Sequence, residues 1–443
     1  MTTHPRRRST SRQWLIVLAC ALAARLAFAA VTHDTYDYDE FVILLLARDY
    51  AHGAVPYHTF MFFHPPGILI LFRLLEPLTS LWWPISHFMV IGIDTGTTML
   101  VWRIAQTLYD RRTALVAGLL YAFHPLALLT ATRVGQDPII TFLGILGLLL
   151  LLRTRGFVGA MISGALLALA VWTKLPALLF LPVFALARPR MFPVVLLGFV
   201  ATLCAVAVPF WPQHHALYDQ IVTFQRTRWS MSLVLRLETI GLFWIVANLL
   251  AFPALMSRRV PTWLALGFLI SAAFVVTSQV YYHYFLPSAP FAALLAAPVV
   301  MRLCRGEIKP LIGAGSLLAV ACGVVVAVGG QRPLLITAAH LSDIEPTIRY
   351  IDRWSRPDEP ILADRLEYAY LAHRLALGHY FRNVGTVWSA QDVERYVPRA
   401  RLVVLSYGAS SGYPPGVQEY LTRTYPRFDT KANTVWRITT ARL

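Results

Sequence analysis

The chain has 443 residues, of which 57% are hydrophobic and 14% are charged, and its mean hydropathy is +0.57. Soluble domains carry about 25% charged residues, so this composition excludes an ordinary soluble protein and predicts a polytopic α-helical membrane protein. The formal net charge is +16, but the basic residues stand in short clusters between apolar runs, a pattern that indicates membrane topology and not a nucleic-acid groove.

The apolar runs predict about eleven transmembrane helices. Residues 1–12 form a short basic tail, and the run 13–31 has the length that a bilayer needs. No small-residue cleavage pattern ends this run, so it is predicted as an uncleaved first span. The further predicted spans cover residues 83–108, 113–131, 138–152, 157–173, 175–187, 191–211, 237–256, 261–280, 285–300 and 311–328.

Loop charges predict the orientation of these spans. Alternate connections carry basic clusters such as Arg6-Arg7-Arg8, Arg111-Arg112 and Arg258-Arg259, and short cytoplasmic loops collect Lys and Arg. The loop 32–82, the turn at Lys174 and the C-terminal segment therefore fall on the extracytoplasmic side. The predicted transmembrane domain is 13–330.

The composition changes after the last apolar run. Helical periodicity appears over 343–354, 365–375 and 417–424, and short strand patterns appear over 360–364 and 401–406, with a possible edge strand over 434–438. Residues 331–443 are therefore predicted to form a small extracytoplasmic α/β domain, within the usual size range of a domain.

Acidic residues gather in the loop after the first span. Asp39 and Glu40 open a predicted helix over 40–51, where the helix dipole favours charged carboxylates. Asp137 stands before Pro138, at the start of a span on the same predicted side. Such acids could supply a general base and a second carboxylate that orients it or holds a divalent cation such as Mg²⁺ or Mn²⁺. The alternatives are a solvated loop face for Asp39 and Glu40, and a helix cap for Asp137.

Basic residues on the predicted outer side run against the usual distribution. Lys174 lies between two apolar runs, and Arg226 and Arg228 lie in a long polar connection. A phosphate headgroup would explain them, and snorkelling to lipid headgroups is the alternative. His283 could donate to a phosphate or a sugar hydroxyl. Asp94, inside a span, is either a functional residue or bonded within the bundle, and the second is preferred.

The order of these motifs resembles the GT-C membrane glycosyltransferases, and in particular the family 39 and aminoarabinose-transferase-like bacterial enzymes. The motifs are the Asp39-Glu40 loop, which ends in His64-Pro65-Pro66, Asp137 before a span, the Thr173-Lys174 hairpin, and a Tyr-x-Leu-Pro-x-x-Pro turn that begins at Tyr284. The aminoarabinose transferases carry Lys-Pro-Pro where this chain has His64-Pro65-Pro66, and a histidine is only partly charged at neutral pH.

The resemblance implies an inverting transfer of a sugar from a polyprenyl-phosphate donor to an acceptor hydroxyl at the outer face of the cytoplasmic membrane. Asp39 would activate the acceptor, with Glu40 beside it and Asp137 as the second carboxylate. The implied substrate-binding residues are His64, Lys174, Arg226, Arg228, His283 and Tyr284. The implied partners are the donor, a glycan, lipid or protein acceptor, and membrane lipids, without nucleic acid.

Two other functions fit the same composition. A transporter would show internal repeats and polar residues near the bilayer midplane in both halves, and Asp94 has no counterpart in the second half. A non-catalytic scaffold or sensor of envelope lipids would have the same architecture, without a cavity shared by Asp39, Glu40 and Asp137. The two remain as alternatives.

Overall fold

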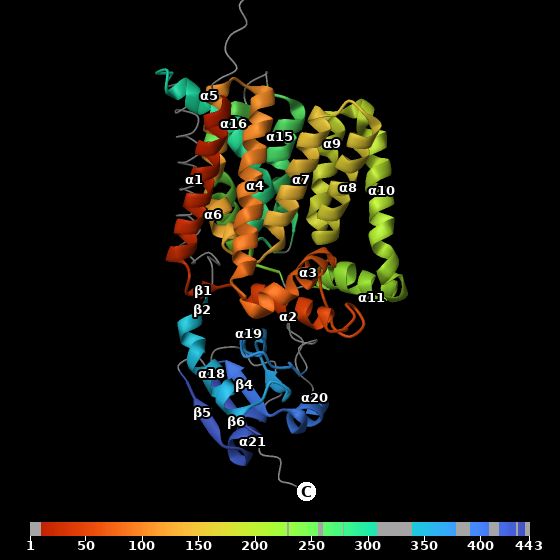
Figure 1. The fold of residues 1–443 in the computed structure, drawn as a ribbon, viewed down its shortest axis with the longest axis vertical. Helices are drawn as coiled ribbons and strands as arrows, with labels where there is room; N and C mark the ends of the chain where they lie inside the picture. Colours follow the sequence, from red (N-terminus) through yellow and green to blue (C-terminus); the bar gives the residue numbers. More distant parts are fainter. Residues whose placement is uncertain are drawn as a thin grey trace, which may run out of the picture. The chain divides into compact units, whose positions relative to one another are not determined.

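The computed structural model describes residues 10–227, 230–255, 260–277, 279–307, 339–377, 390–406, 416–430 and 433–438. These residues form two compact units, which Figure 1 shows in the colours of the sequence. The helical unit is drawn from Met1–Thr32, Pro84–His214 and Trp229–Ile336, and the mixed unit from His33–Trp83, His215–Arg228 and Thr337–Leu443.

The helical unit is built from membrane-spanning helices. Six described helices are long and apolar enough to cross a bilayer, or seven if the pair Arg111–Ala122 and Pro125–Ala131, bent by 50°, is one span. The chain is therefore a multi-pass membrane protein, with about six or seven candidate spans among the described residues instead of about eleven. Three predicted spans form shorter helices, Phe157–Thr173, Leu175–Ala187 and Thr262–Phe274, and the predicted span 311–328 lies outside the described residues.

Broken helices are frequent in this unit because prolines and polar residues interrupt the apolar runs. Its elements are α1 (Thr10–Val31), α4 (Ile85–Leu108), α5 (Arg111–Ala122), α6 (Pro125–Ala131), α7 (Gln136–Arg153), α8 (Phe157–Thr173), η2 (Leu175–Phe180), α9 (Leu181–Ala187), η3 (Pro189–Met191), α10 (Phe192–Ala207), η4 (Val208–Gln213), α13 (Leu233–Ile240), η6 (Gly241–Ile245), η7 (Val246–Ala251), α14 (Phe252–Leu255), α15 (Thr262–Leu269), η8 (Ile270–Val276), η9 (Tyr282–Ser288) and α16 (Ala289–Leu303).

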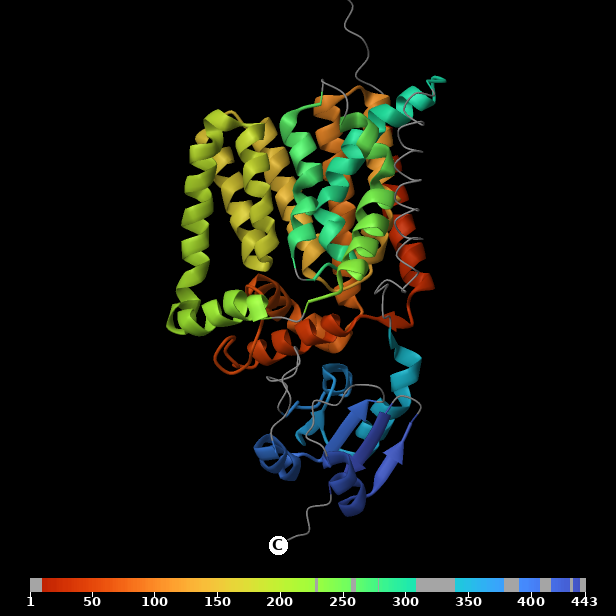
Figure 2. The ribbon, with the colours of Figure 1, turned by 180° about the vertical axis from the view of Figure 1, so that it is seen from behind.

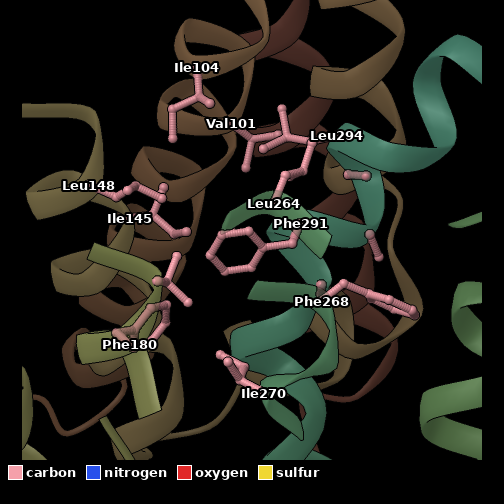
Figure 3. Packing of buried hydrophobic residues seen from close by; sticks show 14 of the residues in the cluster. Val101, Ile104, Ile145, Leu148, Phe180, Leu264, Phe268, Ile270, Phe291 and Leu294 are labelled. Carbon is pink, nitrogen blue, oxygen red and sulfur yellow. The ribbon is translucent and has the colours of Figure 1, made fainter. Parts of the chain in front are cut away.

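Aromatic and aliphatic side chains fill the centre of the helical unit. The ring of Phe291 on α16 lies among side chains of α7 and α15 (Figure 3), with its centroid 6.1 Å from that of Phe180. Helices α8 and α10 lie side by side (Figure 2). They approach closely at Gly164, where the Cβ atom of any other residue would overlap the carbonyl oxygen of Val195. Small residues are the usual means of such close packing between membrane helices.

A buried ion pair joins α1, α4 and α5. Arg25 donates to Oδ2 of Asp94 from Nε at 2.7 Å and also from Nη2, and Tyr121 donates to Oδ1 at 2.8 Å. The remaining guanidinium donors reach the carbonyl oxygens of Ala21 and Ala122 and the hydroxyl of Thr98. Both charged side chains are fully buried. The preferred interpretation of Asp94, a residue bonded inside the bundle, is confirmed.

The mixed unit combines the loop after the first span with the C-terminal segment. Strand β1 (Thr35–Tyr36) pairs antiparallel with β2 (Ala339–His340), and both carboxylate oxygens of Asp34 accept hydrogen bonds from Ser342. The other elements of the unit are α2 (Tyr38–Ala51), α3 (Gly67–Leu81), α11 (His214–Tyr218), η5 (Asp219–Thr223), α12 (Phe224–Thr227), α18 (Leu341–Trp354), β3 (Ile361–Ala363), α19 (Leu366–Leu371), α20 (Ala390–Tyr396), η11 (Val397–Arg399), β4 (Leu402–Ser406), α21 (Val417–Thr424), β5 (Arg427–Asp429) and β6 (Asn433–Arg437).

The C-terminal sheet has the strand order β3-β4-β6-β5, with β3 parallel to β4 and the other pairs antiparallel. The strand predicted over 434–438 is present as β6, but its predicted place at the edge of the sheet is wrong, because β6 lies between β4 and β5. Its outer neighbour β5 has three exposed residues, so it lacks the apolar alternation by which a strand is recognised in a sequence.

Glu367 lies where helix α19 packs against α2 within the mixed unit. Its side chain is fully buried, its Oε1 accepts from the hydroxyl of Tyr36 at 2.9 Å and lies 2.7 Å from Nε of Arg365, and its Oε2 has no hydrogen-bond partner among the described residues. Burial raises the pKa of Glu367 to about 7 and outweighs the attraction of Arg365. The folded unit thus binds a proton that the unfolded chain releases near pH 4.5.

We expect the mixed unit to lose stability as the pH rises. The stabilisation is complete below the ordinary pKa of a glutamate and is lost as the pH passes about 7, by about 3 kcal/mol in total, since one pKa unit is worth about 1.4 kcal/mol. Hydrogen exchange of α19, corrected for the intrinsic pH dependence, measures this change. Glu367→Gln should flatten the profile, and the exposed control Glu419→Gln should not. An unchanged pH slope in Glu367→Gln would contradict the prediction.

Candidate functional site

Asp137 and Lys174 form the centre of the candidate site in the helical unit. Nζ of Lys174 donates to Oδ1 of Asp137 at 2.9 Å and to Oδ2 at 2.8 Å, and both side chains are buried. Lys174 stands at the break between α8 and η2, where its extended backbone turns the chain. Asp137 lies in the first turn of α7, where the helix dipole stabilises its charge.

The helix-cap alternative for Asp137 does not hold. Helix α7 begins at Gln136, and its N-cap is Gly135, which makes no side-chain cap bond. The carboxylate of Asp137 instead accepts both of its strong hydrogen bonds from an ammonium group. The two groups form a buried ion pair, a neutral unit held between two helices.

The turn that begins η9 adds two rings to this pair. Nε2 of His283 lies 3.8 Å from Oδ2 of Asp137, and Nζ of Lys174 lies 4.6 Å from the centroid of the Tyr284 ring. The His283 side chain is partly exposed, and its ring stacks on Tyr281. The structure therefore brings together four of the predicted site residues, Asp137, Lys174, His283 and Tyr284.

The two acids predicted as catalytic in the first loop lie at the start of α2 in the mixed unit. Asp37 is the N-cap and accepts from the backbone N–H of Asp39, and the side chain of Glu40 accepts from the backbone N–H of Asp37 at 2.7 Å. This capping box satisfies helix N–H groups that would otherwise have no partner. Glu40 is fully buried, so its carboxylate has a structural role in the fold.

The other predicted site residues also belong to the mixed unit. The backbone carbonyl oxygen of His64 accepts from the hydroxyl of Tyr57 at 2.7 Å, and the His64 ring lies edge-on to Phe62. Arg226 is exposed on α12. Arg228 lies outside the described residues. Within the described ranges, no group of three or more His, Cys, Asp and Glu side chains could hold a metal ion.

Sequence reasoning missed two buried polar side chains of the helical unit. Glu238 on α13 is buried, and neither of its carboxylate oxygens has a hydrogen-bond partner among the described residues. The same holds for Nε2 of Gln136, next to Asp137. The position of Glu238 at the start of an apolar run was a usable signal, because an acid in a membrane segment is a functional candidate.

Comparison with family models decides the family. The model of PIG-U, described as GPI transamidase subunit PIG-U, matches residues 18–265, more than half of the chain. The chain belongs to the PIG-U family. Comparison with curated proteins gives no match.

The PIG-U family member has a GT-C-like fold. It is similar to ArnT from Cupriavidus metallidurans bound to undecaprenyl phosphate, with a TM-score of 0.61 and 14% identity over 97% of this chain and 98% of that chain. It is also similar to the oligosaccharyltransferase of Archaeoglobus fulgidus in the apo form, with a TM-score of 0.55 and 11% identity over 99% of this chain and 75% of that chain. At these identities the likeness concerns the fold alone.

Membership in the PIG-U family corrects the functional prediction. The predicted glycosyltransferase family and activity are wrong, because the matching model describes a transamidase subunit. The motifs that carried the resemblance are features of the fold. The Asp-Glu pair belongs to a capped helix, and the Thr-Lys hairpin places Lys174 beside Asp137. These features fit a GT-C-like fold with or without sugar transfer.

Proposed function

We propose that this chain is a non-catalytic subunit of a membrane complex, in which it binds the phosphate headgroup of a lipid and presents it to a partner protein. The proposal is supported first by the family, since PIG-U is described as a subunit of GPI transamidase. By analogy, the partners proposed here are other protein subunits and a glycolipid. This takes up the scaffold alternative of the sequence analysis.

The observation that carries the proposal is the neutral pair of Asp137 and Lys174. A general base must be free to accept a proton, but both oxygens of Asp137 accept from the ammonium group of Lys174. Removing this carboxylate from its partner would leave two buried charges unpaired, at a cost of several kcal/mol. The pair therefore fits a rigid binding site better than a site of proton transfer.

The same site offers donors to an anionic headgroup. An ammonium group has three N–H donors, and Asp137 accepts two hydrogen bonds from Lys174. The third donor and the imidazole of His283 are the groups proposed to reach a phosphate oxygen, beside the ring of Tyr284. A lipid phosphate is the proposed ligand because ArnT, which shares the fold, binds undecaprenyl phosphate. The roles predicted from the sequence for Asp39, Glu40, His64, Arg226 and Arg228 stay predictions and are not part of this site.

The proposal places the chain in a membrane as a multi-pass subunit. The plasma membrane predicted from the sequence is not part of it, since the family match gives no support for that location.

Purification of the tagged chain from native membranes in a mild detergent tests the proposal. We expect native mass spectrometry to detect a protein partner at fixed stoichiometry and a phosphate-bearing lipid. His283→Gln should lower lipid retention several-fold and leave the protein partner in place. Arg103→Gln, which removes an exposed charge on α4, is the matched control and should change neither. A chain that purifies without any partner, or that by itself transfers a lipid-linked sugar, would refute the proposal.

A further inference from the structure

Helix α3 carries apolar residues on two opposite faces. Ile68, Leu69 and Phe72 are buried on the face that packs against α2 within the mixed unit. Leu74, Leu78 and Leu81 follow at the spacing of one helical face and are 74%, 49% and 85% exposed. Trp82, directly after the helix, continues this second face and is also exposed. We call Leu74, Leu78, Leu81 and Trp82 the outer face of α3.

An outer face of this composition needs a partner. Single exposed leucines are common on proteins, but three of them with a tryptophan in one row mark an interaction surface. In the part of the chain that the structure describes, all four side chains remain exposed. Because the inner face of α3 is already packed, the exposed leucines of the outer face are open to contacts outside the described chain.

The chain itself places this face near a bilayer. Only Trp83 and Pro84 separate Trp82 from Ile85, the first residue of α4, and α4 is long and apolar enough to cross a membrane. A chain spans at most about 3.6 Å per residue, so Trp82 lies within roughly 11 Å of the start of that span.

The residues beside the outer face suit a membrane surface. Arg73 is exposed, and its guanidinium lies 4.2 Å from the centroid of the Tyr50 ring, so the charge is held at the edge of the row. Lipid phosphates at an interface attract such a cation, and Trp is enriched at the same depth. A helix with leucines and a tryptophan on its exposed face is typical of a helix that lies in the interfacial plane.

We infer that α3 is an interfacial helix, with the outer face of Leu74, Leu78, Leu81 and Trp82 inserted among the lipid headgroups and the ends of the acyl chains. The inference does not depend on the proposed function. Its consequence is that the first loop is attached to the bilayer between its two flanking spans, so that the capped helix α2, on which α3 packs, is held near the membrane surface.

Spin labelling in proteoliposomes tests this inference. In a full-length chain whose four native cysteines are replaced, Leu78→Cys carries a nitroxide label. We expect the label to be relaxed more strongly by oxygen, which partitions into the bilayer, than by a water-soluble nickel complex. Leu74→Cys gives a second reading on the same face. The matched control is Gln418→Cys, on an exposed position of α21, where the nickel complex should dominate.

Each other outcome overturns the inference. If the nickel complex dominates at residues 74 and 78 as it does at residue 418, the outer face lies in water. If neither reagent reaches these two positions, a protein covers the face and α3 is a docking helix for a partner subunit. Both labelled positions are exposed in the folded chain, so the labels need not disturb the fold.

Discussion

Arg25→Leu is expected to destabilise the helical unit by about 3–5 kcal/mol, because it leaves the carboxylate of Asp94 buried without its cation. Among the described contacts of its carboxylate, Asp94 would keep the hydrogen bond from Tyr121. Asp94→Leu should have a similar effect, since it strands the guanidinium of Arg25. The double variant Arg25→Leu/Asp94→Leu removes both charges and should recover most of the loss.

Unfolding of the purified chain by heat or denaturant in detergent measures this double-mutant cycle. Arg103→Leu, an exposed arginine on the same helix as Asp94, is the control and should change the free energy of unfolding by less than about 0.5 kcal/mol. If the losses of the two single variants simply add up in the double variant, the two side chains do not stabilise each other, and the prediction is contradicted. A coupling free energy of several kcal/mol between Arg25 and Asp94 would agree with their contacts.

Lys174→Met is expected to produce the second large effect, also of about 3–5 kcal/mol. It leaves Asp137 buried beside the imidazole of His283, whose Nε2 lies 3.8 Å from Oδ2. The variant should therefore be less unstable at an acidic pH that protonates this imidazole than at a pH where the imidazole is neutral. Asp137→Asn/Lys174→Met, which removes both charges, should be closer to the unchanged chain than either single variant.

Unfolding at two pH values distinguishes this pair from a surface ion pair. Arg349→Met breaks an exposed pair with Glu345 and is the matched control, with an expected cost below about 1 kcal/mol. A cost for Lys174→Met as small as that of the control would mean that the Asp137–Lys174 pair contributes little. The proposed rigid site would then lose its physical basis.

Much of the fold could be predicted from the sequence, because apolar runs and their interruptions carry a strong signal. Helix α8 has the predicted bounds, since its run begins after a glycine and ends at Lys174. Helix α21 and strand β4 also follow their periodic patterns. The joining of β1 to β2 could not be predicted. Two-residue strands about 300 positions apart show no periodicity, and their pairing depends on the completed fold.

The candidate site was predictable in part. Asp137 and Lys174 attract attention because charges are rare among apolar runs, but a sequence does not show that they neutralise each other. Asp39 and Glu40 were predicted as a reactive pair for a similar reason, and the structure places them in the first turn of a capped helix. A capping box and a catalytic acid pair use the same residue types, and a sequence does not show that the side chains of Asp37 and Glu40 accept hydrogen bonds from backbone N–H groups. The predicted glycosyltransferase activity was wrong because short motifs in the expected order indicate a similar fold and not a shared reaction.

The pairing of β1 with β2 has a consequence for biosynthesis. In the sequence, β1 comes before most of the helical unit and β2 comes after it, yet the two strands pair in one small sheet. The loop after the first span therefore cannot reach its final contacts until the ribosome has made Ala339 and His340. Contacts between such distant segments form slowly and late. The mixed unit therefore matures only after the preceding helices have entered the membrane, and a chain that stops early leaves β1 as an exposed edge that quality control could recognise.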